Sequence, residues 1–461
     1  MSEPQNTKFT YCIPDHYFEG YVSIKPRYST IFWKHEYFGD VKGAPKDFTL
    51  PTSNKENGML SEKATSRVTT AVNWLVELAD EKKFVHPTKL NVKGNPLEVK
   101  FKIAFITLTL PSKQVHSDNE ILEQCLQPFI KKLVERFGTK VVADNKNGFR
   151  YVLNYIWKAE KQTIDNYKED IGNIHFHITI DKFIWHAEIR DLWNMFIERI
   201  GYVSAYRDKM LNFHKDGFTV REDLLVERDN GKHNTKKVWS LEDQKQAYER
   251  GCATGWMSPN STDIHSVQKI KDLARYISKY VAKNPLTDIE RKDYEIIIED
   301  KLKIDQGFHF ELPAEYDNLD LGFRAKCLKY LDAINERMKI YRSKIVTCRI
   351  WDCSQSLEKI KLVLDIDENL LDGEFFNVIQ TEEYKKRKIQ MDASREPNPF
   401  FLIVPFSVQE LKAIGAKKIA AKYDEFISQK KKEFADGTLR RSKNEGKTIE
   451  LPTVYASDMA A

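Results

Sequence analysis

The stretch NIHFHITID, residues 173–181, places two histidines on either side of one phenylalanine. Its β-branched and aromatic residues predict a β-strand, in which alternate side chains project from the same face. His175 and His177 therefore share one face, and Phe176 and Ile178 point into the core. Two imidazoles about 7 Å apart along a strand can bind one divalent ion. An isolated pair of this kind is more often structural, so the neighbouring segments decide its interpretation.

A partner strand for this stretch precedes it. Residues 148–162, GFRYVLNYIWKAEKQ, alternate like a strand, and a turn-rich connector then leads to the histidines. The two strands predict a β-hairpin. Glu160 lies on the face opposite Trp157, so pairing can bring its carboxylate beside the imidazoles. Two histidines and a carboxylate suit Mg²⁺ or Mn²⁺ that polarises a phosphate.

Strands and helices alternate around this hairpin. VKFKIAFITLTLP, residues 99–111, reads as a strand of a covered sheet. Residues 117–138 form an amphipathic helix that Pro128 should kink or split, and a second helix follows at 187–201. The predicted class is α+β.

The rest of the chain is less clearly patterned. We expect a helix at 61–83, and strands with long loops across the polar residues 202–255. Composition and turn signals divide the chain into three parts. Residues 1–95 are an N-terminal extension and a candidate for DNA contact, residues 96–285 are the domain that carries the motifs, and residues 286–461 are a C-terminal α+β region without an assigned role.

A second motif lies in the segment RYISKYVAK, residues 275–283. Tyr276 and Tyr280 are four residues apart and share one face of a helix. Lys279 and Lys283 each follow a tyrosine by three residues. A phenol attacks a phosphodiester when a metal withdraws charge from the phosphate and a nearby cation lowers the phenol pKa. Tyrosines at this spacing are usually an aromatic stripe on a helix. The pair indicates nucleophiles only in combination with the two histidines.

The order of three segments resembles the motifs of HUH-type rolling-circle replication initiators. These segments are FITLTL at 105–110, HFHITID at 175–181 and YISKYVAK at 276–283. The paired tyrosines are similar to those of initiators from single-stranded DNA phages and related plasmids. The resemblance covers residues 97–285. It implies the HUH endonuclease fold, an RRM-like or palm-like antiparallel sheet flanked by helices, with N- and C-terminal extensions.

The resemblance also implies a metal site. His175 and His177 would bind a divalent cation, Mg²⁺ or Mn²⁺, with Glu160 as the third ligand. The strand at 105–110 would lie beside the histidine strand and support the site.

The nucleophiles implied by the resemblance are Tyr276 and Tyr280, with Lys279 and Lys283 assisting. One tyrosine would attack the scissile phosphate of single-stranded or locally melted origin DNA. The products would be a 5′-phosphotyrosine link and a free 3′-OH that primes synthesis, and the second tyrosine would allow later rejoining.

Several alternatives stay open. A relaxase or a single-strand transposase of the same superfamily, or a non-catalytic origin-binding protein, could carry similar motifs. A two-histidine phosphoesterase would need a second H-x-T/S element in addition to HIT at 177–179.

Composition limits which binding partners and which cellular location are expected. The chain has 73 basic and 68 acidic residues, a net charge of +5, which permits a nucleic-acid partner without requiring one. Its six cysteines are scattered, and the N-terminal residues lack a secretory pattern. No apolar run is long enough to cross a membrane. We expect a protein of the host bacterial cytoplasm with no membrane partner. Because the chain lacks a G-x-x-x-x-G-K-[ST] motif, we also expect it to use a host helicase and replication machinery.

Overall fold

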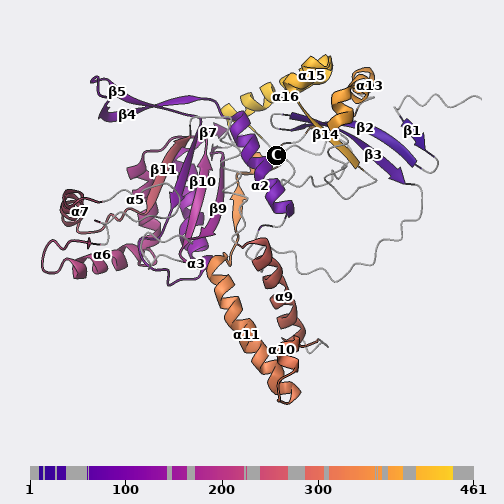
Figure 1. Ribbon diagram of the computed structural model, residues 1–461. Coiled ribbons are helices and arrows are strands. Elements are labelled where there is room, and N and C mark those ends of the chain that lie inside the picture. The colour runs from indigo at the N-terminus through magenta and orange to yellow at the C-terminus, as the bar shows by residue number, and fades with distance from the viewer. Residues whose placement is uncertain are drawn as a thin grey trace, which may run out of the picture.

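The computed structural model in Figure 1 is a mixed assembly of helices and antiparallel sheets, which confirms the α+β class. It describes residues 10–13, 16–25, 28–37, 60, 62–142, 148–162, 172–222, 225, 239–267, 286–305, 311–358, 360, 362–365, 372–387 and 401–439.

A five-stranded antiparallel sheet forms the centre of the molecule. Its strand order is β11-β6-β10-β9-β12. The bounds are β11 (Thr262–Val267), β6 (Ile103–Leu108), β10 (Ile174–Ile180), β9 (Tyr155–Lys161) and β12 (Trp351–Cys353). The histidine strand, β10, is therefore central, with the predicted partners β6 and β9 on either side.

The register assigns each side chain of β10 to a face. Phe176 lies opposite Leu108 of β6 and Ala159 of β9, and His177 lies opposite Thr107 and Lys158. Since side chains alternate along each strand, apolar residues fill one face and the histidines lie on the other.

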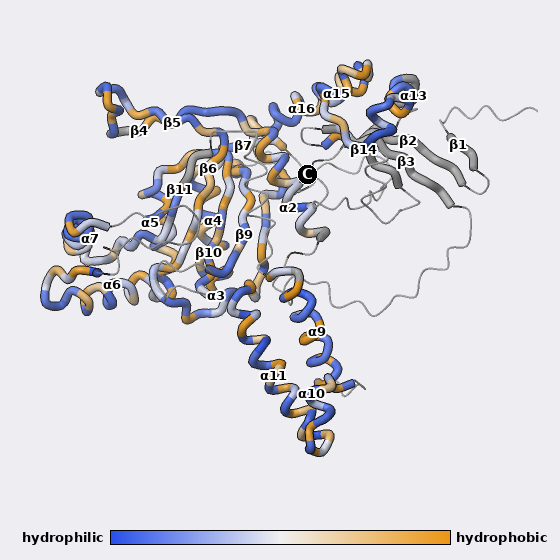
Figure 2. Tube along the Cα trace, in the orientation of Figure 1, coloured by the Kyte–Doolittle hydropathy of each residue, from blue (hydrophilic) through white to orange (hydrophobic). Residues whose placement is uncertain are grey.

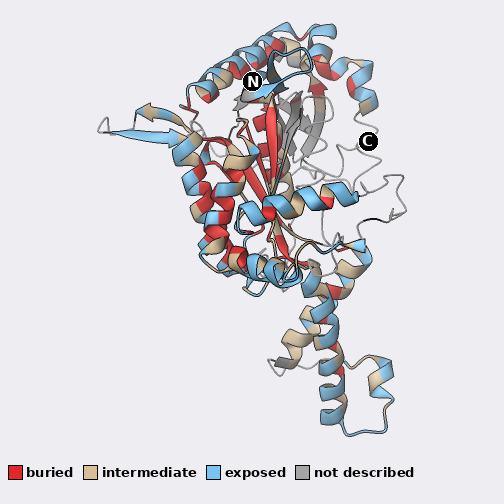
Figure 3. Cartoon of the chain, turned by 90° about the vertical axis from the view of Figure 1, so that its left-hand side faces the viewer, coloured by how far each residue is buried: buried red, intermediate tan, exposed pale blue. Residues whose placement is uncertain are grey.

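Helices α3 (Asp118–Ile121), η1 (Leu122–Leu126), α4 (Gln127–Phe137) and α5 (His186–Glu198) cover the apolar face. The ring of Trp193 on α5 contacts both Phe176 and Phe129, with centroids 6.1 and 5.5 Å apart. In Figure 3 the sheet strands appear as a buried layer. The helix predicted at 117–138 is present, and it is split by the π-helical turn η1 next to Pro128, as that proline indicates.

Within the described part of the chain, the histidine face is covered at one end only. Helix α2 (Glu62–Leu78), within the predicted 61–83, packs with Ile103, Ile156 and Cys353 into a core shared with α16 (Lys417–Ala435). The histidines lie toward the other end of the face, where their side chains are only partly buried.

A second antiparallel sheet joins distant parts of the sequence. Strands β1 (Thr10–Ile13), β2 (His16–Lys25) and β3 (Tyr28–Tyr37) form a meander, and β3 pairs with β14 (Phe401–Ser407). Strand β13 (Leu362–Asp365) pairs with β2. Three short helices follow the C-terminal strands, namely α12 (Gln355–Glu358), α13 (Asp372–Gln380) and α15 (Val408–Ala413).

Three further pieces extend from this body. Hairpin β4 (Lys82–Leu90)–β5 (Pro96–Phe101) projects at the upper left of Figure 1, and a helical hairpin projects at its base. That helical hairpin consists of α9 (Asp288–Asp305), α10 (Ala314–Asp317) and α11 (Phe323–Lys344). The hairpin β7 (Thr139–Val142)–β8 (Phe149–Val152) forms a small sheet of its own.

Two expectations are corrected. Residues 202–255 contain helices α6 (Tyr202–Phe213) and α7 (Leu241–Ala253) where strands and loops were expected. A capping box between Ser240 and Asp243 starts α7, and helices with few buried residues leave little apolar periodicity to detect. The single strand expected at 148–162 is two strands, because Leu153 and Asn154 interrupt it between β8 and β9.

Candidate metal centre

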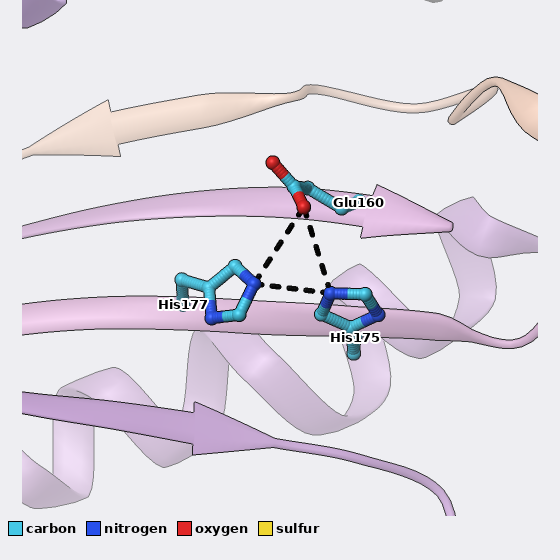
Figure 4. Close-up of side chains that lie close together, drawn as sticks. All are labelled: Glu160, His175 and His177. Atoms are coloured by element: carbon cyan, nitrogen blue, oxygen red, sulfur yellow. Dashed lines mark hydrogen bonds and ion pairs between the residues drawn. The ribbon is translucent and has the colours of Figure 1, made fainter. Parts of the chain in front are cut away.

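Glu160, His175 and His177 converge on one point of the central sheet (Figure 4). Glu160 of β9 lies opposite His175 of β10, which confirms the pairing expected from the sequence. The Nε2 atoms of the two histidines are 3.0 Å apart. The Glu160 Oε2 atom lies 3.7 Å from His175 Nε2 and 3.6 Å from His177 Nε2. Among the described residues this is the one group whose spacing suits a metal ion.

The spacing of these three atoms matches the size of a divalent cation. A circle through atoms separated by 3.0, 3.6 and 3.7 Å has a radius of about 2.0 Å, and metal–nitrogen and metal–oxygen bonds of this class are about 2.0–2.2 Å. Three lone-pair atoms this close repel one another unless a proton or a cation lies between them. The donor set therefore fits a divalent ion without rearrangement of the strands.

Lys158 holds the carboxylate in place from the other side. Its ammonium group, on a side chain only 3% exposed, donates a 2.8 Å hydrogen bond to Glu160 Oε1. The second oxygen, Oε2, is left to face the histidines. Burial raises the pKa of the Glu160 carboxyl, but its contacts with His175, His177 and Lys158 outweigh burial, and the pKa lies well below its usual value. Glu160 is thus an anion, which is the form that binds a metal.

Neighbours on β6 orient His177. Thr107 Oγ1 lies 3.1 Å from His177 Nδ1, and the Phe105 ring stacks on the imidazole with centroids 5.1 Å apart. When Nδ1 carries the proton and donates it to Thr107, the lone pair of Nε2 points toward the ligand position. Burial lowers the pKa of His177, and this favours the neutral, ligating imidazole.

The triad is shielded but reachable. The side chains of Glu160, His175 and His177 are 22%, 15% and 12% exposed, respectively. A bound ion would therefore keep open positions on the solvent side, as a catalytic site requires. The chemistry that this arrangement can supply is polarisation of a phosphate oxygen.

Comparisons with known proteins do not identify the family. The chain matches no protein-family model, no curated protein and no solved structure. None of the described helices is both long and apolar enough to cross a lipid bilayer.

The predicted nucleophiles cannot be placed next to the triad. Tyr276, Lys279, Tyr280 and Lys283 lie outside the described residues. The last described element before them is strand β11, which ends at Val267.

Two functional neighbours were missed by the sequence analysis, namely Lys158 and Thr107. Strand alternation places both on the histidine face, but it does not indicate that Lys158 is buried. Lys158 is two residues from Glu160, and Thr107 lies in the FITLTL strand opposite His177.

Proposed function

We propose that this chain is a rolling-circle DNA replication initiator that nicks its origin by metal-dependent tyrosine transesterification. The observation that carries the proposal is the convergence of Glu160, His175 and His177 on the face of the sheet that faces away from α4 and α5. This is the site that the HUH resemblance requires, built by the β9–β10 pairing. The HUH fold is part of the same proposal, supported by a central antiparallel sheet with the histidine strand in the middle.

The charges at the triad favour a phosphate as the ligand. Lys158 offsets the charge of Glu160, and the histidines are neutral ligands, so the protein groups sum to about zero charge. A divalent ion held there, Mg²⁺ or Mn²⁺, would give the site a positive charge and polarise the scissile phosphate. The protein residues orient that ion and keep its open positions toward the solvent side.

The proposed step balances as a transesterification. The phenolic oxygen of Tyr276 or Tyr280 forms a bond to phosphorus, and the bond from phosphorus to the 3′-oxygen breaks. The phenol loses its proton, with Lys279 or Lys283 stabilising the phenolate, and the leaving oxygen gains a proton to become the 3′-OH. One phosphodiester replaces another, so cleavage and rejoining need no ATP.

The test uses a single-stranded DNA pool of randomised sequence with Mn²⁺ and the full chain. A label at the 3′ end should become covalently attached to the protein, and a label at the 5′ end should leave on a shorter fragment with a free 3′-OH. The double variant Tyr276→Phe/Tyr280→Phe should form no adduct, and Glu160→Gln should reduce it by about 100-fold or more, the scale of a lost metal-site interaction.

The matched control is Tyr151→Phe, at an exposed tyrosine of β8, and it should react like the wild type. An adduct that persists in the tyrosine double variant would refute the assignment of the nucleophiles. A chain that binds origin DNA but never forms an adduct would favour the non-catalytic origin-binding protein.

A further inference from the structure

One hairpin of this protein carries a local excess of positive charge. Residues 82–102, which contain β4 and β5, include six lysines and one glutamate, a net charge of +5. The whole chain also has a net charge of +5. The remaining residues therefore carry equal numbers of basic and acidic side chains, and the hairpin accounts for the entire excess.

The hairpin is exposed along most of its length. It leaves the body of the molecule as a two-stranded ribbon (Figure 1), with hydrophilic residues prominent along it (Figure 2). At its tip the Leu90 side chain is 62% exposed and Val92 is fully exposed. Asn91 Oδ1 accepts hydrogen bonds from the backbone N–H groups of Lys93 and Asn95. These bonds give the turn a defined shape although no residue that the structure describes packs against its tip.

Aromatic contacts fix the base of the ribbon. The Phe84 and Phe101 rings lie 4.5 and 5.6 Å from Phe183, just before α5. The Lys89 ammonium lies 5.1 Å from the Trp185 ring centroid. A two-stranded hairpin is only marginally stable by itself, so this anchor is what holds the basic ribbon in one direction.

Three exposed lysines of the hairpin can reach a partner. Lys83 forms only a surface ion pair with Glu98, at 3.3 Å. Lys93 and Lys100 are exposed, and neither forms an ion pair with a carboxylate of the described residues. Exposed lysines on an edge strand also discourage pairing with another strand, and a second copy of this ribbon would be repelled by its equal charge. The ligand should therefore be a polyanion.

We propose that the β4–β5 hairpin is an arm that binds the phosphate backbone of duplex DNA. A two-stranded ribbon fits the major groove of B-form DNA, which is about 12 Å wide. The six residues of β5 span about 20 Å, more than half of one helical turn. The major groove of A-form RNA is too narrow for it. The proposal uses neither the triad nor the tyrosines, so it stands independently of the nicking activity.

Binding of the full chain to a 20-base-pair DNA of mixed sequence tests the arm. Fluorescence anisotropy is measured in EDTA over a series of KCl concentrations, so that no metal-dependent cleavage contributes. The variant Lys83→Gln/Lys93→Gln/Lys100→Gln should bind about tenfold or more weakly. Its slope of log Kd against log salt should fall by about 2 to 3, since each lost phosphate contact removes about 0.9.

A matched variant distinguishes DNA binding by the arm from an effect of the protein's net charge. Lys215→Gln/Lys245→Gln/Lys417→Gln removes three exposed lysines elsewhere, with the same change in net charge. It should keep the affinity and the slope of the wild type. Equal losses in both variants would overturn the proposal. So would a hairpin variant that binds duplex DNA normally but loses binding to single-stranded DNA or to phosphatidylserine vesicles.

Discussion

At the level of single residues, the candidate site depends on alternation along two paired strands. His175, His177 and Glu160 could be identified from the sequence because residue type and period 2 place them on one face. The ion pair between Lys158 and Glu160 could not be identified from the sequence, because a lysine on a strand usually reaches solvent. The burial of Lys158 depends on how β12 and α2 pack. That buried cation decides which carboxylate oxygen faces the histidines.

The hydroxyl of Thr107 should affect metal affinity. Thr107→Val keeps the side-chain shape but removes the partner of His177 Nδ1. Loss of such an outer contact typically weakens metal binding about 10- to 100-fold, and we expect a change of this size in Mn²⁺ titration calorimetry. The control is Thr254→Val. Thr254 lies at the end of α7, and its hydroxyl donates a hydrogen bond to the carbonyl oxygen of Arg250. Equal affinities for Thr107→Val and wild type would show that Thr107 does not orient the ligand.

At the level of elements, local patterns predicted most of the central sheet and the helices on its apolar face. Strands β6, β9 and β10 and helix α4 lie within segments identified from the sequence, and α5 begins one residue before the predicted 187–201. The break between β8 and β9 was not predictable, because Asn154 bonds to Ser356, about 200 positions later in the chain. The hydrophobic periodicity of a segment gives no information about such a distant contact.

The two faces of β10 should respond differently to truncation. The Phe176 side chain is fully buried between Trp157 and Trp193, so Phe176→Ala should cost about 3–5 kcal/mol in free energy of unfolding. His177→Ala removes a partly exposed side chain and should cost much less, while abolishing metal binding. Urea denaturation of both variants checks this difference. A larger loss of stability in His177→Ala would reverse the assignment of faces.

At the level of the whole molecule, the two ends of the described chain form one sheet. Strand β3 pairs with β14 across more than 360 intervening residues. No sequence pattern indicates this pairing, since pairing over this distance depends on the complete fold. The central sheet therefore lies beside a second sheet that is built from N- and C-terminal strands of the chain.

The purified chain should not unwind duplex DNA. Gly446, Lys447 and Thr448 end a P-loop-like run that lacks its first glycine, because Arg441 occupies that position. A strand-displacement assay with ATP should therefore give no more product than the ATP-free reaction. Addition of a host helicase should give unwound product. ATP-driven unwinding by the chain alone would contradict the expected dependence on a host enzyme.

Mass spectrometry of the covalent adduct tests the central claim most directly. After reaction with single-stranded DNA and Mn²⁺, nuclease digestion should leave a nucleotide 5′-phosphate on the reacting tyrosine. Trypsin cleaves after Arg275, Lys279 and Lys283, so the two tyrosines fall in separate peptides, 276–279 and 280–283. We predict the nucleotide mass on one or both of these peptides in the wild type and on neither in His175→Ala/His177→Ala. Modification of any other residue, or none at all with active DNA binding, would contradict the proposed mechanism.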